Sequence, residues 1–250
     1  MSALADNVWM LRTVAAALGE DLLKDLAFVG GATTSLFLDD DLAKEHVRHT
    51  KDVDVIVNII GRAGWYQLQE KLRKCGFSEC IDADAPVCAM KLKTEKLRVD
   101  FMPDDEGILG FSNRWYRPAL RDAAWRCLPG EPEQKIRLIS PQYFVATKLE
   151  AWLGRGNNDP LGSTDVEDLL ILFDGRSTIF DELNSAGLEM QGFLAMELHK
   201  LLNNPGFDLV VRGCTQDSGR AELMFENIER FVQFHQECQQ GAAPKAEVER

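Results

Sequence analysis

The sequence lacks the marks of several common protein classes. It has no apolar run long enough to cross a bilayer or to form the core of a signal peptide, and residues 1–6 lack the basic start of one. Its six cysteines include no C-x-x-C pair and most lie far from the four histidines, which disfavours structural zinc. Nothing indicates an oxidising compartment, so we expect reduced thiols in a cytoplasmic protein without a membrane segment.

Positive charge is also scarce. The 28 lysines and arginines face 40 aspartates and glutamates, which gives a formal net charge of −12. This balance disfavours binding of nucleic acid through a generally basic surface, although it leaves room for a local basic groove. Acidic clusters suit hard metal ions, so the carboxylates are the first residues to search for a site.

The hydrophobic pattern divides the chain into two halves. β-Branched and apolar runs predict strands at residues 27–31, 52–60, 88–93, 96–102 and 135–140. Helical spacing of apolar residues predicts helices at residues 4–26, 32–38, 64–75, 142–153, 165–173, 178–186, 188–202 and 220–236. We therefore predict an α+β fold with a sheet and flanking helices at residues 1–140, a helical C-terminal domain at residues 141–238 and a disordered tail at residues 239–250.

Two of the expected strands carry carboxylates. Asp52 and Asp54 stand two residues apart at the start of one strand, so both side chains point to the same face. Asp100 lies in the strand at residues 96–102 and would join them if the two strands are neighbours. Clustered carboxylates repel one another and need a counter-ion, and Mg²⁺ prefers oxygen ligands. An Asp-x-Asp pair alone, however, is more often a solvated strand edge.

A glycine turn precedes this carboxylate pair. Gly30 and Gly31 follow one expected strand and open the expected helix that contains Thr33 and Thr34. Glycines let a phosphate approach the backbone, and the free amides at a helix start attract anions. A lone Gly-Gly is usually an ordinary turn. A strand, a glycine turn, a helix and an Asp-x-Asp strand in succession form a much more specific pattern for a nucleotide site.

These motifs resemble the signature of the nucleotidyltransferase superfamily. The resemblance rests on Gly30-Gly31 and on the run Arg-His-Thr-Lys-Asp-Val-Asp from Arg48 to Asp54. Within the superfamily the chain is most similar to the AbiEii-type toxins of type IV toxin–antitoxin and abortive-infection systems, including the MenT group. Many superfamily members have serine in place of Gly31, so a hydroxyl contact would have to come from one of the two following threonines.

The resemblance continues in the second half of the chain. The run Lys-Leu-Glu-Ala from Lys148, then Arg155, then the run Ser-Thr-Asp-Val-Glu-Asp-Leu at residues 163–169 are similar to the lysine and acidic-helix motif of the same family. The similarity covers roughly residues 25–176. Beyond residue 176 the helices carry no motif that transfers.

The resemblance implies a nucleotidyltransferase-fold mixed sheet with the active site in the cleft between two domains. The residues implied to hold Mg²⁺, or Mn²⁺ in its place, are Asp52, Asp54 and Asp100. Asp100 is also implied as the base for the acceptor hydroxyl. The residues implied to bind the nucleoside triphosphate are Gly30, Gly31, Thr33, Thr34, Arg48 and Lys148. Lys148, with Asp165 or Asp168, is implied to complete the catalytic group from the helical half.

Some of these residues also permit simpler interpretations. Lys148 suits a solvated helix face beside a glutamate, and Arg48 suits an ion pair with an acidic neighbour. Asp165 suits a helix N-terminus, where capping and the helix dipole favour a carboxylate. Asp168 is harder to explain in this way, because it lies further into the helix.

The reaction implied is the in-line attack of an acceptor hydroxyl on the α-phosphorus of a nucleoside triphosphate, with release of pyrophosphate. The implied acceptor is the 3′ end of a tRNA or a protein side chain, and the implied partner is a cognate antitoxin. A basic strip at Lys91, Lys93, Lys96 and Arg98 would suit RNA, but it suits a solvated hairpin face equally well.

Two other functions stay open at this point. An antibiotic-modifying nucleotidyltransferase of the aminoglycoside type would match the acidic charge, but the lysine and acidic-helix motif argues against it. A regulator that binds nucleotide without turnover would have a degenerate site, whereas Asp52, Asp54 and Asp100 are all present.

Overall fold

The computed structural model describes residues 2–59, 61–82, 85–105, 107, 113–155, 159–215 and 217–241. Its strands are β1 (Leu26–Val29), β2 (Asp52–Val57), β3 (Phe77–Glu79), β4 (Ala89–Leu92), β5 (Leu97–Pro103), β6 (Ala124–Leu128) and β7 (Glu131–Leu138). Within the described residues these seven strands form one sheet in the order β3-β4-β5-β2-β1-β7-β6. The sheet is mixed, because β2 pairs parallel to β5 and antiparallel to β1.

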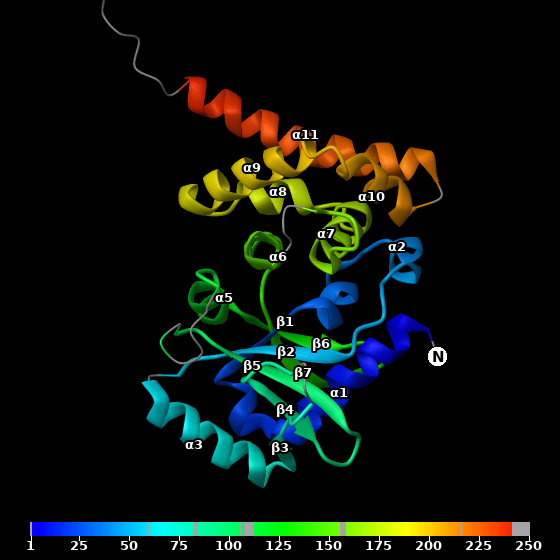
Figure 1. The fold of residues 1–250 in the computed structure, drawn as a ribbon. Helices are drawn as coiled ribbons and strands as arrows, with labels where there is room; N and C mark the ends of the chain where they lie inside the picture. Colours follow the sequence, from blue (N-terminus) through cyan, green and yellow to red (C-terminus); the bar gives the residue numbers. More distant parts are fainter. Residues whose placement is uncertain are drawn as a thin grey trace, which may run out of the picture.

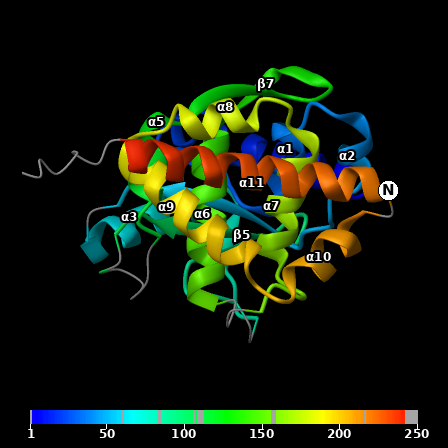
Figure 2. The same ribbon diagram turned by 90° about the horizontal axis from the view of Figure 1, so that it is seen from above.

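The helices are α1 (Ala3–Leu23), η1 (Gly31–Phe37, a 3₁₀ helix), α2 (Asp41–Glu45), α3 (Gly61–Lys74), α5 (Tyr116–Asp122), α6 (Pro141–Arg155), α7 (Thr164–Gly175), α8 (Ile179–Asn184), α9 (Leu188–Leu202), α10 (Phe207–Cys214) and α11 (Ser218–Gly241). In Figure 1 the helices from α6 onward lie above the sheet, and α1 and α3 lie below it. Seen from above in Figure 2, α11 runs across this upper layer, where it packs on α7, α8, α9 and α10. The carboxyl end of the sheet strand β7 leads directly into α6.

Local sequence explains the helix α1 and the central strand β2. Ser2 caps α1 by accepting a hydrogen bond from the backbone amide of Ala5, and the expected stripe Val8, Leu11, Val14 and Leu18 is buried. In β2 the burial alternates: Val53 and Val55 are fully buried, while the two aspartates between and before them are half-buried. This alternation is the period of two that a strand imposes.

The expected α+β fold, with a sheet followed by helices, is confirmed. The sequence did not predict β3 and β6, and it assigned the segment of α2 to a loop. The last helix runs to Gly241, past the expected start of the disordered tail at residue 239, and residues 242–250 lie outside the described residues. A loop was also expected at residues 103–110, of which residues 106 and 108–110 lie outside the described residues. The division into separate domains at residues 140 and 141 remains a prediction.

No helix in the described part of the chain combines the length and the apolar composition that a bilayer crossing needs.

Candidate functional site

The three carboxylates predicted to bind metal lie on one face of the sheet. β2 and β5 are neighbours, as expected, and their parallel register places Asp54 beside Asp100 and Asp52 beside Arg98. Because side chains alternate along a strand, Asp52 and Asp54 share a face with Asp100. The charge of Lys148, on α6, acts on both Asp52 and Asp54, so this face lies within electrostatic reach of that helix. The sequence reasoning on strand order and side-chain direction is therefore confirmed.

Arg98 connects two of these carboxylates. Its Nε donates to Asp100 Oδ1 at 2.9 Å and its Nη2 donates to Asp100 Oδ2 at 2.7 Å. The same Nη2 lies 3.0 Å from Asp52 Oδ2. One guanidinium therefore holds one carboxylate by both oxygens and the other by a single oxygen, which is a strong, directional form of ion pair.

The pKa of Asp54 is shifted far from its ordinary value. Burial, followed by the nearby charges of Asp52 and Asp100, raises the pKa of Asp54 to about 7. Burial and the charge of Asp100 also raise the pKa of Asp52. Burial and mutual repulsion disfavour the ionised form of these two carboxylates, and a cation bound between them would offset both effects.

The glycine turn is shaped around these side chains. Gly30 has φ of 78°, and a Cβ atom on it would lie 1.9 Å from Asp54 Oδ2. A Cβ atom on Gly31 would lie 2.4 Å from Nη2 of Arg48. A side chain at position 30 would therefore displace Asp54 and strain a left-handed backbone, and one at position 31 would displace the guanidinium of Arg48. The turn brings the backbone of residues 30 and 31 directly against two candidate site residues.

The threonines after the turn do not present hydroxyls to a ligand in this structure. Thr33 Oγ1 donates to the carbonyl of Gly30 at 2.7 Å, and Thr33 and Thr34 are both fully buried. Thr33 thus fastens the turn to the first turn of η1. Thr34 Oγ1 is buried without a hydrogen-bond partner among the described residues, and the nucleotide contacts of the two hydroxyls remain a prediction.

The helical half contributes a buried group of ion pairs. Lys148 Nζ on α6 lies 2.6 Å from Asp168 Oδ2 and 3.2 Å from Asp165 Oδ1, both on α7. Arg48, from the segment before β2, donates to both oxygens of Asp168 at 3.0 and 2.9 Å. The exposed guanidinium of Arg155, at the end of α6, holds Asp165. Arg48 is therefore ion-paired with an acidic residue, as its simpler interpretation expected. Lys148 is buried and pairs with two aspartates, whereas its simpler interpretation expected a solvated lysine beside a glutamate.

The charges in this group are mutually dependent. Burial opposes the charge of Lys148, but Asp168 and Asp165 outweigh it, so the pKa of Lys148 lies above its ordinary value. Burial likewise opposes the charge of Asp168, but Lys148 and Arg48 hold its pKa below the usual range. The charges of Lys148 and Arg155 also act on Asp54. The helical cations therefore lie near enough to the sheet carboxylates to influence their protonation.

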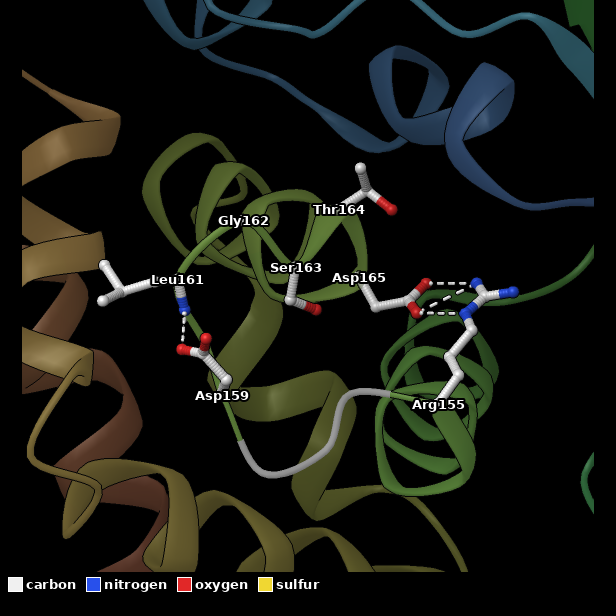
Figure 3. Close-up of a pocket in the computed structure, with 7 residues that line it drawn as sticks. All are labelled: Arg155, Asp159, Leu161, Gly162, Ser163, Thr164 and Asp165. Carbon is white, nitrogen blue, oxygen red and sulfur yellow. Dashed lines mark hydrogen bonds and ion pairs between the residues drawn. The ribbon is translucent and has the colours of Figure 1, made fainter.

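A hollow opens beside this group. It has a volume of about 360 Å³ and lies between the end of α6 and the start of α7, where Figure 3 shows Arg155 and Asp165 paired on one side and Ser163 and Thr164 on the helix start. Ser163 caps α7 by accepting from the amide of Val166. A second hollow of about 410 Å³, lined partly by Arg48 and by apolar residues of α7 and α10, shares Leu161 and Gly162 with the first.

Sequence reasoning missed three residues of this region. Arg98 was assigned only to a basic strip, Arg155 received no role of its own, and Tyr116, at the start of α5, was not considered. Burial and then the charge of Asp54 raise the pKa of Tyr116, which places its phenol near the carboxylates. The spacing of Arg98 two residues before Asp100 was the one available signal, since it puts both on the same face.

The basic strip is not a continuous cationic surface. Lys91 pairs with Asp82, and Arg98 pairs with two carboxylates. Lys93 and Lys96 lie exposed in the turn between β4 and β5. Of the four residues, two therefore have their charge neutralised within the chain.

No group of three or more His, Cys, Asp or Glu side chains within the described ranges is arranged as a ready-made metal centre. Comparison with known protein families found no matching model, and comparison with curated proteins found no significant relative.

Proposed function

We propose that the chain is a metal-dependent nucleotidyltransferase, with the nucleotidyltransferase fold, that transfers a nucleoside monophosphate from a nucleoside triphosphate to an acceptor hydroxyl. The observation that supports it most is that three carboxylates of β2 and β5 lie on one face of the sheet beside the glycine turn, where the charge of the buried Lys148 of α6 acts on two of them. Clustered carboxylates of raised pKa beside a cleft are typical of functional sites.

The donor set fits Mg²⁺ or Mn²⁺. All three residues offer hard carboxylate oxygens, and Asp52 and Asp100 already share one cation in the guanidinium of Arg98. Asp54 lies beside Asp100 in the register and has a raised pKa, as expected of a carboxylate that needs a neighbouring positive charge. A divalent ion held by these residues would supply charge neutralisation at the α-phosphate and a more acidic acceptor hydroxyl.

The protein's own groups would orient the triphosphate. The backbone amides after Gly30 lie at the start of η1 and suit phosphate oxygens. Lys148 and Arg155 of α6 provide positive charge that acts on Asp54. The first of these is fixed by two carboxylates, so its ammonium is positioned before substrate arrives, and positioning of this kind supplies most of the rate in phosphoryl transfer.

Asp100 is the proposed base for the acceptor hydroxyl, as the family resemblance implies. Both of its oxygens are engaged by Arg98 in this structure. Because the guanidinium stabilises the ionised carboxylate, Asp100 becomes a better proton acceptor once that ion pair has opened.

The proposed acceptor is a tRNA end or a protein hydroxyl, and the proposed biological setting is a toxin-like enzyme controlled by a cognate antitoxin. These parts rest on the motif resemblance alone. Surfaces of a generally acidic chain favour an acceptor that makes few phosphate contacts, because long RNA contacts need many unpaired cations.

The test is transfer of label from an α-³²P nucleoside triphosphate to RNA or protein in a cell extract containing Mg²⁺. The wild type should label an acceptor, and Asp54→Asn should lose at least about 100-fold, since it removes one carboxylate from the site. Asp82→Asn is the matched control, because this exposed carboxylate pairs with Lys91, is not one of the proposed metal ligands and should leave labelling unchanged. Equal labelling by Asp54→Asn and the wild type would refute the assignment, and Mg²⁺-dependent nucleotide binding without any product would indicate a regulator.

A further inference from the structure

Arg98 occupies the position where the proposed metal would bind. Its guanidinium lies 2.7 Å from Asp100 and 3.0 Å from Asp52, so it already bridges two of the three carboxylates. A guanidinium stays protonated throughout the pH range in which proteins are folded. The two carboxylates therefore have a permanent cation within the chain itself.

The sheet register makes this contact unavoidable. Arg98 stands two residues before Asp100 on β5 and is the direct partner of Asp52 in the parallel pairing. All three side chains consequently project from the same face at adjacent positions. The pair is also sheltered: the side chain of Arg98 is 23% exposed and that of Asp100 is 6% exposed. An ion pair with this geometry and shelter is held more firmly than a solvated surface pair.

We propose that Arg98 is a resident counter-ion that must leave Asp52 and Asp100 before a divalent ion can bind them. This inference rests on the proposed function, since it takes these carboxylates to be metal ligands. Metal and guanidinium then compete for the same oxygens. The apparent affinity of the protein for metal is reduced by the fraction of molecules in which the pair is open. Metal-free protein is thus mostly in the closed state, and metal binding holds the pair in the open state.

The first test measures Mn²⁺ binding to metal-free protein without nucleotide, by the electron paramagnetic resonance signal of free Mn²⁺. Arg98→Ala removes the competitor and should bind Mn²⁺ at least about tenfold more tightly than the wild type. Arg98→Lys keeps the charge but loses the planar fork, so it should fall between the two. Unchanged or weaker binding by Arg98→Ala overturns the proposal.

Lys91 provides the matched control. It is the direct partner of Arg98 across β4 and β5, shares its face and carries the same charge, but its ammonium pairs with Asp82. Lys91→Ala should therefore change Mn²⁺ affinity by less than about twofold, as expected for a screened charge at a distance. If Lys91→Ala strengthens binding as much as Arg98→Ala does, the effect is general electrostatics and displacement is wrong.

A second measurement uses the wild-type chain and does not depend on a folded variant. The ¹⁵N–¹H signal of the Arg98 Nε group should shift on addition of Mg²⁺, because its hydrogen bond to Asp100 is lost. An unmoved signal at saturating Mg²⁺ contradicts the displacement. Asp54→Asn separates the two proposals. Suppose that the wild type binds Mn²⁺, that Asp54→Asn does not, and that Arg98→Ala binds with the affinity of the wild type. In that case only the proposed role of Arg98 fails. If neither the wild type nor Arg98→Ala binds Mn²⁺, the metal-dependent function fails with it.

Discussion

Replacing Asp54 with Asn should stabilise the metal-free protein at pH 8. Burial, and then the charges of Asp52 and Asp100, raise the pKa of Asp54 from 3.8 to about 7. A rise of about three units corresponds to about 4 kcal/mol of unfavourable interaction once the carboxylate ionises. Because the side chain is half-buried beside a cleft, solvent screening reduces this value, and we expect a gain of about 1–3 kcal/mol in the free energy of unfolding.

The pH dependence of this gain is specific. A carboxyl whose pKa is raised on folding binds its proton more tightly in the folded state than in the unfolded state. Between about pH 4 and pH 7 the folded wild type therefore loses stability as pH rises, and above about pH 7 the loss is complete. The stability difference between Asp54→Asn and the wild type should be near zero at pH 4 and largest at pH 8.

Urea denaturation of both proteins from pH 4.5 to pH 8, in the presence of a chelator, measures this difference. For a chain of this length a gain of about 2 kcal/mol also corresponds to a rise of roughly 4–8 °C in melting temperature. A difference that does not vary with pH, or a variant less stable than the wild type at pH 8, would refute the electrostatic account. Added Mg²⁺ should stabilise the wild type and not the variant, because only the wild type retains the full set of ligands.

Asp104 is the control carboxylate for this experiment. It is also buried, but its oxygens accept hydrogen bonds from Asn58, from the amide of Ile59 and from Arg117. Asp104→Asn breaks satisfied bonds and should cost about 1–3 kcal/mol. Opposite signs for the two Asp→Asn changes would separate a functional carboxylate from a structural one.

Two further substitutions test the site at other points. Lys148→Met removes the ammonium that pairs with two buried carboxylates of α7. It should lower the free energy of unfolding, measured in urea, by about 3–5 kcal/mol and abolish nucleotidyl transfer. A stability within about 1 kcal/mol of the wild type would contradict the buried pairing. Gly30→Ala and Gly19→Ala both place a side chain at a left-handed φ, which is 78° at Gly30 and 68° at Gly19. Only Gly30→Ala brings a Cβ atom against Asp54. Loss of nucleotidyl transfer in Gly30→Ala alone would show that this close approach matters beyond backbone strain.

Local patterns were enough to place the carboxylates. The Asp-x-Asp spacing on a β-branched strand specifies one face, and the glycine turn before it specifies a close backbone approach. Asp52 and Asp54 therefore lie as their spacing predicts. The contact of Arg98 with Asp52 was not predictable in the same way, because it depends on the register between two strands distant in sequence. Such a register is set by the whole sheet and leaves no local signal.

The missed strands have a similar explanation. β3 has three residues, and the first four residues of β6 are exposed, so neither carries the alternation that identifies a half-buried strand. Both lie at the edges of the sheet, where one side of the strand has no partner strand. The beginning of β7 is also polar and exposed, and only its buried end, which lies next to β1, was predicted. Tertiary pairing, and not local propensity, decides these elements.

The candidate site residues of the two halves carry unequal charges of opposite sign. On the sheet, three carboxylates face one internal guanidinium, so negative charge is in excess. In the buried group near the helices, three cations face two carboxylates: Arg48, Lys148 and Arg155 against Asp165 and Asp168. These cations therefore outnumber the carboxylates with which they pair by one. The charges of Lys148 and Arg155 also act on Asp54 of the sheet. The proposed nucleotidyl transfer would thus need both halves, because a triphosphate with its metal carries charges of both signs and would match the two unequal surfaces together.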